Sequence, residues 1–264
     1  MAKGFVVGIV FMAAVAGLTA CSRSKATGGL HFETLVTERS VSIDSEAGAP
    51  QCRVRLELAA PTGSDEAARE VNAAVALELL GMEGVSLREA ADSFANSYTR
   101  SYLKDFGPLY REDADDPARK AWYEYHYNIS SEVTAGREGV AVYKAVVDYY
   151  EGGAHGVSQQ LFMNFDTRSG RRLALSDFFV PGFEQPLSFK LLQALMALTG
   201  TGSVDELREK GYLYETDMFA TENFAAGSKG FTFVYNPYEI APYSEGIIRL
   251  DLEADELGDV LKKD

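Results

Sequence analysis

The chain has 264 residues, 46% of them hydrophobic, and a formal net charge of −14. This length and composition can fill one large domain or two small ones with a sizeable core. The acidic charge excludes a nucleic-acid-binding role, because such a body repels phosphate, and it favours encounter with basic partners.

The N-terminus has the pattern of a bacterial lipoprotein signal peptide. Lys3 provides a positive charge, the apolar run Phe5–Gly17 follows, and Leu18-Thr19-Ala20-Cys21 places small residues before a cysteine. The apolar run is shorter than the ~20 residues that span a bilayer, so cleavage is expected rather than a membrane helix. We expect acylation of Cys21 to anchor the mature protein in the bacterial cell envelope, in the periplasm or at the outer membrane.

Cys52 would then be the one remaining cysteine, so no intramolecular disulfide is expected. An odd cysteine in an exported protein indicates either a buried thiol or intermolecular pairing. The alternating segment QCRVRLEL around Cys52 favours burial, since a free cysteine behaves as a small hydrophobic residue.

Two strands and two helices are predicted in the first part of the chain. His31–Ser42 and Gln51–Ala60 alternate as strands, and a helix begins at Ser64 and stops at Gly81. A second helix starts with a capping box of Ser86 and Glu89. Its apolar face at helical spacing is predicted to join the core: Leu87, Ala91, Phe94, Tyr98 and Tyr102. The acidic run that follows, EDADDP at 112–117, lacks the ligand spacing of a calcium loop and is predicted to be a solvated turn.

From Ala121 the hydrophobic period changes to two. Three consecutive antiparallel strands are predicted, at Trp122–Val133, Gly139–Tyr150 and Val157–Phe165. The glycine-rich turn Gly152–Gly156 joins the last two.

Helices and two further strands are predicted after this meander. A helix is expected at Gln185–Thr199, with a stripe of Leu187, Leu191, Leu195 and Leu198. A short helix capped by Ser203 and Glu206 follows it. The strands Phe231–Tyr235 and Ile247–Leu252 are expected to close the sheet, and Asp255–Lys262 to form a terminal helix.

These elements predict an α+β fold, with an antiparallel sheet and helices packed on one face. Four segments are expected: a signal peptide at 1–20, a flexible stalk at 21–29, an N-terminal α+β accessory region at 30–120 and a C-terminal α+β region at 121–264. Since no strong linker separates the last two, we expect them to form one compact body.

The segment Gly230–Gly246, GFTFVYNPYEIAPYSEG, is the strongest indication of a functional surface. Pro237 and Pro242 make the loop after the strand stiff and extended. We expect its aromatic and acidic residues to form a ligand-binding surface: Tyr235, Tyr238, Glu239, Pro242, Tyr243 and Glu245. A hydrogen-bonded corner that closes a domain is the other interpretation of such a cluster.

A second motif, YYEGGAHG at Tyr149–Gly156, runs into VSQQLFMNFDTRSGRRLALSDFF at Val157–Phe179. Together with NPYEIAPYSEG, these motifs resemble the extracellular domain of RsiV-type anti-sigma factors, which are lysozyme receptors, and of related bacterial lipoproteins. The resemblance covers the chain from about Tyr123 onward. More weakly, residues from about His31 to Tyr110 resemble the accessory domain that also precedes some peptidoglycan deacetylases. In anti-sigma factors a cytoplasmic region and a membrane-spanning helix come before this module, a pattern from which the present sequence departs.

No enzyme motif accompanies these segments. His31, His126 and His155 have no metal-ligand spacing, and neither a GxSxG motif nor a reactive-cysteine context is present. His155 is the one candidate general base, and we include it in the ligand-binding surface.

We therefore expect a non-catalytic binding module without a metal or cofactor. The resemblance implies a lysozyme-like muramidase or cell-wall glycan as the ligand. A glycan-modifying enzyme that uses His155, and a structural subunit of an envelope complex, are the alternatives.

Overall fold

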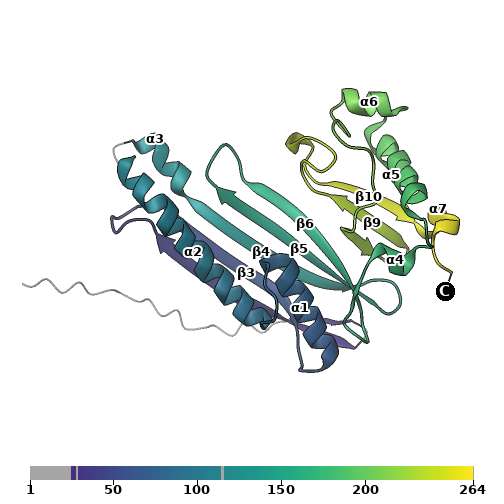
Figure 1. Ribbon diagram of the computed structural model, residues 1–264, viewed down its shortest axis with the longest axis horizontal. Coiled ribbons are helices and arrows are strands. Elements are labelled where there is room, and N and C mark those ends of the chain that lie inside the picture. The colour runs from purple at the N-terminus through teal and green to yellow at the C-terminus, as the bar shows by residue number, and fades with distance from the viewer. Residues whose placement is uncertain (1–24, 28, 114–115, 264) are drawn as a thin grey trace, which may run out of the picture.

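The computed structural model describes residues 25–27, 29–113 and 116–263, which form an α+β structure with two sheets (Figure 1). The α+β prediction is confirmed. The expected signal peptide and Cys21 lie outside the described residues, as does part of the acidic run 112–117. Within the described part of the chain, no helix is long and apolar enough to cross a membrane.

The larger sheet has seven strands in sequential order. They are β1 Lys25–Thr27, β2 Leu30–Ser42, β3 Gln51–Pro61, β4 Tyr125–Ala135, β5 Val140–Glu151, β6 Val157–Asp166 and β7 Arg172–Leu173. All neighbours pair antiparallel except β3 and β4. The predicted meander of three strands is β4–β5–β6. The segment Lys25–Thr27 was expected in a flexible stalk, and it instead pairs with β2.

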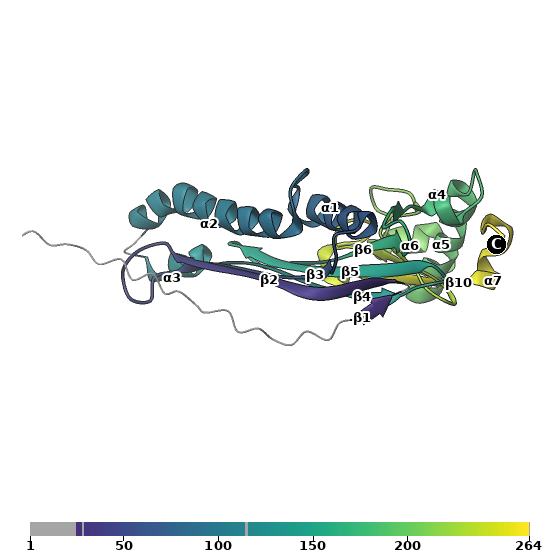
Figure 2. The same ribbon diagram turned by 90° about the horizontal axis from the view of Figure 1, so that it is seen from below.

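The parallel β3–β4 pair requires a crossover, which is made by α1 Glu66–Leu80 and α2 Leu87–Glu112. Both helices lie on one face of the large sheet (Figure 2). The N-cap of α1 is Asp65, one residue later than the predicted start, while Gly81 ends the helix in the left-handed conformation. The capping box that opens α2 is confirmed. Two short turns, α3 Pro117–Lys120 and η1 Ala121–Tyr123, return the chain to β4.

The core under these helices joins both predicted regions of the chain. Side chains from β3, β4, β5 and both helices form one buried cluster that includes Leu56, Val71, Ala91, Ile129 and Tyr143. A neighbouring cluster contains Cys52, which is a buried free thiol as predicted. Burial raises the pKa of Cys52 to about 12, so its thiol is neutral at physiological pH.

The strands near the C-terminus do not close the large sheet, so that expectation is wrong. They form a separate antiparallel sheet of β8 Phe224–Ala226, β9 Gly230–Tyr235 and β10 Ile248–Glu253, in the order β10–β9–β8. Alternation along a strand shows which residues are buried, but it does not identify the neighbouring strand.

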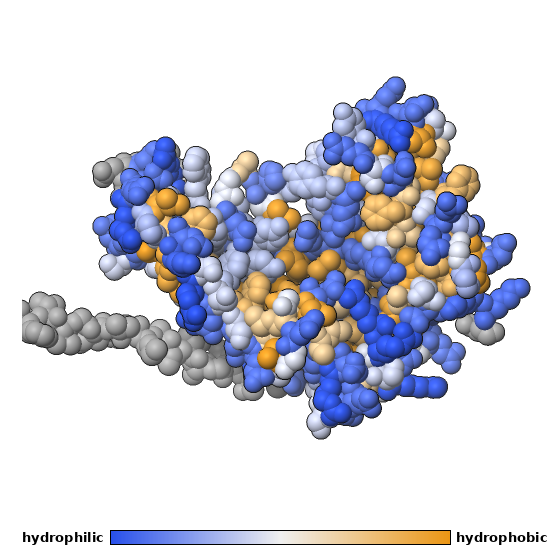
Figure 3. Space-filling view, viewed as in Figure 1, coloured by the Kyte–Doolittle hydropathy of each residue, from blue (hydrophilic) through white to orange (hydrophobic). Residues whose placement is uncertain are grey.

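Short and long helices surround the small sheet. They are α4 Leu175–Phe178, α5 Glu184–Thr199, α6 Val204–Glu209 and α7 Ala254–Leu257, with 3-10 turns η2 Tyr243–Glu245 and η3 Gly258–Val260. The helix α7 near the C-terminus is therefore shorter than the predicted helix Asp255–Lys262. Three leucines of the α5 stripe are buried, whereas Leu198 is 60% exposed and does not belong to it. Figure 3 shows the molecule from the same side as Figure 1. Apolar side chains gather toward the middle of this view and over α5, and polar side chains lie along the outer margins.

Three asparagine side chains join the two sheets. At the outer edge of β6, Asn236 accepts from the Gln160 amide at 2.7 Å and donates to the Gln160 carbonyl at 3.1 Å. Asn223 accepts from the Phe162 amide and donates to the Gln160 carbonyl, both at 2.8 Å. These amide groups occupy hydrogen-bonding positions that a further strand would use.

The third asparagine makes the reciprocal contact from β6 to the small sheet. Asn164 donates to the Phe224 carbonyl and accepts from the Ala226 amide, both at 2.8 Å, and its side chain is buried. The Phe224 carbonyl and the Ala226 amide, at the free edge of β8, thus have hydrogen-bond partners. The two sheets are therefore fixed to each other by side-chain amides in both directions.

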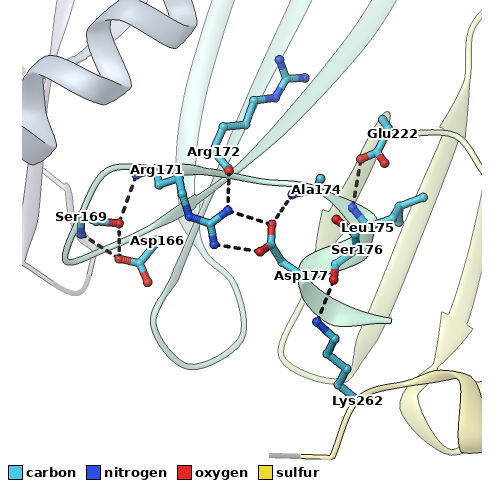
Figure 4. Close-up of polar contacts among 10 residues, drawn as sticks. All are labelled: Asp166, Ser169, Arg171, Arg172, Ala174, Leu175, Ser176, Asp177, Glu222 and Lys262. Carbon is cyan, nitrogen blue, oxygen red and sulfur yellow. Dashed lines mark hydrogen bonds and ion pairs between the residues drawn. The ribbon is translucent and has the colours of Figure 1, made fainter. Parts of the chain in front are cut away.

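The motif DTRSGRRLALSDFF forms a second polar connection, shown in Figure 4. Asp166 accepts from the Ser169 amide at 2.7 Å and shapes the turn after β6. Arg171 donates to both carboxylate oxygens of Asp177, at 2.8 and 3.1 Å, and Asp177 also accepts from the Ala174 amide. This part of the motif therefore has a structural role in setting α4 against the sheet.

Replacing Asn164 by alanine should lower the free energy of unfolding by about 3 kcal/mol, because the Phe224 carbonyl and the Ala226 amide would be buried without partners. Chemical denaturation measures the change. Asn128→Ala in β4 is the matched control, since the half-buried Asn128 side chain makes no hydrogen bond to the described residues. Equal losses in the two variants would contradict the role given to Asn164.

Asp177→Asn should lower stability at pH 7 by about 1 kcal/mol, since it weakens a bidentate pair that is only partly shielded from solvent. The hydrogen bond from Arg171 lowers the pKa of Asp177, so the folded state binds this proton more weakly than the unfolded state. Its contribution is present above the ordinary carboxyl pKa of about 4 and is lost as pH falls through the lower folded value.

Urea denaturation of both proteins from pH 7 to pH 3 should show the difference narrowing at the acid end. Asp217→Asn is the control, because Asp217 pairs with Arg208 while remaining 95% exposed. A pH-independent difference for Asp177→Asn would show that the pair does not act through the carboxylate charge.

Candidate functional site

The loop between β9 and β10 is held in one conformation by its own hydrogen bonds. The Asn236 amide donates to the Glu239 carboxylate at 3.0 Å, and the Glu239 amide donates to the Asn236 carbonyl at 3.1 Å. The Tyr238 amide donates to the Ala241 carbonyl at 3.0 Å. Asn236, which binds β6, thus also sets the start of the loop.

The structure separates the tyrosines that the sequence grouped together. Tyr238 is 65% exposed at the tip of the loop, and Tyr243 is half-buried. Tyr235 is fully buried, with its hydroxyl donating to the Phe219 carbonyl at 2.5 Å, so its expected place on the ligand surface is wrong. Tyr235 is the last residue of β9 and faces the core of the small sheet. The domain-closing interpretation applies to this residue, and the exposed-surface interpretation applies to Tyr238.

The structure brings the turn that contains His155 against the tyrosine loop, although Gly156 and Tyr243 are 87 positions apart in the sequence. The His155 and Tyr243 rings stack with centroids 3.9 Å apart and an angle of 18°. The Tyr243 hydroxyl donates to the Gly156 carbonyl at 2.6 Å. The turn itself depends on Gly152 and Gly153, which both have positive φ, and a Cβ on Gly152 would lie 2.8 Å from the Trp122 carbonyl oxygen. The two predicted parts of the surface are therefore adjacent (Figure 1).

The two acidic residues of the loop have different environments. The Glu245 carboxylate accepts from the Tyr212 hydroxyl at 2.5 Å, and burial together with this bond raises the pKa of Tyr212 to about 12. Partial burial raises the pKa of Glu239, because its charged form has lost part of its hydration. Glu245 thus ties the loop to the segment after α6.

A groove of about 450 Å³ lies between this loop and the segment after α6. The lining residues are Gly211, Tyr214, Glu215, Thr216, Tyr238, Glu239, Ile240, Ala241 and Pro242. Tyr214 is 77% exposed and lines the groove together with Tyr238. The Leu213 amide donates to the Ile240 carbonyl at 2.7 Å and joins the two walls.

The backbone is strained on both sides of the groove. Among the described residues, Leu213 and Tyr238 are the non-glycine residues with positive φ, at 52° and 73°. Such conformations cost on the order of 1 kcal/mol or more and persist where surrounding contacts impose them. The bonds of Leu213 to Ile240 and of Tyr238 to Ala241 are these contacts. These hydrogen bonds thus hold the backbone on both sides of the groove.

The remaining histidines do not join this surface. His126 contacts Asp148 at 3.0 Å and faces the side of the large sheet away from α1 and α2. His31 lies on β2. Within the part of the chain that the structure describes, no three histidine, cysteine or acidic side chains are grouped to hold a metal ion.

Tyr212, Tyr214 and Glu215 belong to the surface but were not selected from the sequence. They lie in an irregular segment without hydrophobic periodicity, so only the aromatic and acidic composition of GYLYET marked them. The pairing of this segment with NPYEIAPY depends on tertiary structure.

Comparison with known proteins shows a related domain of unassigned function. Residues 176–255 match the model of the family described as "Protein of unknown function (DUF3298)". No curated protein matches the chain.

Two solved structures have a similar fold. A member of the DUF3298 family from Bacteroides fragilis is 28% identical with a TM-score of 0.80, and the match covers 90% of this chain and 96% of that one. A DUF3298 family protein from Pseudomonas aeruginosa is 22% identical with a TM-score of 0.59, over 88% of this chain and 94% of that one, and shows similarity of fold alone.

Proposed function

We propose that this protein is an envelope lipoprotein whose folded body is a non-catalytic binding module for a basic, lysozyme-like protein. The proposed binding surface consists of Tyr238, Glu239, Pro242, Tyr243 and Glu245 of the loop, together with His155. The main observation in support is the exposed Tyr238, whose backbone a strained and hydrogen-bonded turn holds at the rim of a groove that Glu215 and Glu239 also line. Rigid tyrosines of this kind bind at low entropic cost.

Charge supports a basic partner. The chain carries a net charge of −14, and Glu239 and Glu245 add local negative charge beside the aromatic rings. Such a field accelerates encounter with a cationic protein. The resemblance of the loop and of the Gly152–Gly156 turn to lysozyme receptors points to the same class of ligand.

The surroundings of His155 support binding rather than catalysis. Its Nδ1 atom lies 3.2 Å from the Gly156 carbonyl oxygen, and its ring stacks on Tyr243. The Nδ1 atom and the ring face of His155 therefore both make contacts within the protein. No hydrogen bond to a serine, cysteine or carboxylate activates it among the described residues. We therefore assign His155 to the binding surface.

Tyr238→Ala should weaken binding by about 2 kcal/mol, mainly through faster dissociation, because an exposed and rigid aromatic side chain is the expected anchor of the interface. Surface-based kinetics with the soluble form, residues 22–264, and a panel of purified muramidases measures the effect. Glu245→Gln should mainly slow association, and this effect should fade at high salt as charges are screened. Phe189→Ala is the control, since Phe189 is also exposed but lies on α5.

Absence of saturable binding by every muramidase at low salt would reject the proposed partner. Binding that is unchanged by Tyr238→Ala would place the interface elsewhere. Binding of soluble peptidoglycan fragments by a chain that binds no muramidase would favour the glycan ligand instead.

Cys21→Ala should abolish labelling with a palmitate analogue and release the protein from the membrane fraction, since the acylated thiol is the proposed anchor. Metabolic labelling and fractionation compare the variant with the parent. Cys52→Ala is the matched control, because the buried Cys52 thiol should not be acylated in the folded protein. Undiminished labelling and membrane association of Cys21→Ala would refute the lipid anchor.

A further inference from the structure

We propose that the groove between the segment after α6 and the β9–β10 loop is a pocket for a single lysine or arginine side chain. This inference rests on the proposed function, because it specifies which part of a basic partner the surface receives. The groove contains Tyr214 and Glu215, which lie outside the motif that suggested the binding surface.

The shape and lining of the groove match a long side chain with an apolar stem. Ile240 and Ala241 are buried residues of the lining, and Pro242 adds a further apolar surface. Tyr214 and Tyr238 are both largely exposed. Lysine and arginine place their methylene groups along apolar and aromatic surfaces of this kind while the charged end contacts polar groups.

The electrostatics of the groove select a cation. Two carboxylates, Glu215 and Glu239, line it, and none of the residues that line it is lysine or arginine. Arg208, on the adjacent α6, is paired with Asp217. A bound cation would therefore meet carboxylates that no lysine or arginine of the lining neutralises.

A bound cation would stabilise the charged form of the Glu239 carboxylate. This carboxylate accepts from the Asn236 amide, and Glu239 is an exposed residue whose pKa is raised by loss of hydration. A cation in the groove would replace the hydration that this carboxylate has lost. An anionic ligand would meet the carboxylates of Glu215 and Glu239 without compensation.

The groove is fixed in shape, which favours a defined subsite over a loose acidic patch. Its walls are joined by the Leu213–Ile240 hydrogen bond, and Tyr212 bonds to Glu245 beyond it. Gly211 has a φ of +90°, and a Cβ built there would lie 3.5 Å from the Pro242 ring. The hydrogen bonds from Leu213 to Ile240 and from Tyr212 to Glu245 keep the two walls of the groove together.

The test is an NMR titration of the isotope-labelled soluble chain, residues 22–264. The probes are the Nα-acetyl amides of lysine, arginine and norleucine, the last having a similar stem without charge. We expect saturable shifts of the Tyr214, Glu215 and Tyr238 amides with the two cations but not with norleucine. Glu239→Gln should weaken cation binding about fivefold, since it retains the acceptor for the Asn236 amide but removes the charge.

Glu33→Gln is the matched control, because Glu33 is an exposed residue of β2 outside the groove, and this substitution should leave the titration unchanged. Equal shifts with norleucine, shifts spread over the whole acidic surface, or an unaltered affinity in Glu239→Gln would each overturn the pocket. The probes are independent of any protein partner. Cation binding in the groove with no muramidase binding would therefore reject the proposed partner alone, while muramidase binding without cation binding would reject only the pocket.

Discussion

The arrangement of the C-terminal half depends on how the outer edge of β6 is hydrogen-bonded. The short β7 covers only Asn164 and Phe165 of that edge, so Gln160 and Phe162 would expose backbone groups to another strand. The amides of Asn223 and Asn236 meet these groups instead. A side-chain amide has donors and an acceptor like a peptide group, but it does not continue as a strand. The large sheet therefore stops here, and the small sheet forms as a separate unit.

Asn236 links this edge of β6 to the candidate site. Its side chain binds β6 and its backbone begins the β9–β10 loop, so the position of the loop depends on the large sheet. The β5–β6 turn lies on the same sheet, and it meets the loop through the His155–Tyr243 stack. Two segments of different sheets thus form one surface, held by the asparagine contacts between the sheets and by the hydrogen bond from the Tyr243 hydroxyl to the Gly156 carbonyl.

Local signals in the sequence predicted the elements well, and long-range pairings escaped them. The capping box at Ser86 and the stop at Gly81 depend on neighbouring residues, and both are confirmed. The separate small sheet and the burial of Tyr235 depend on contacts between distant segments, which alternation does not encode. The asparagine contacts join residues 60 to 76 positions apart. Because asparagine is also common in turns, its presence in the sequence does not indicate such a contact. Tyr214 and Glu215 were missed for the same reason, since only tertiary structure brings them to Tyr238.

The sheet also determines how a tethered protein would present this surface. The described chain begins at Lys25, which pairs with Phe32 near the end of β2 that lies beside Pro61. The β5–β6 turn lies at the other end, because Glu151 pairs with Tyr125, Tyr125 with Cys52, and Cys52 with Val41. The nine residue steps from Phe32 to Val41 span about 30 Å in an extended strand. Lys25 and the β5–β6 turn therefore lie at opposite ends of the large sheet, so a lipid on Cys21, four residues before Lys25, would attach at the end away from the tyrosine loop.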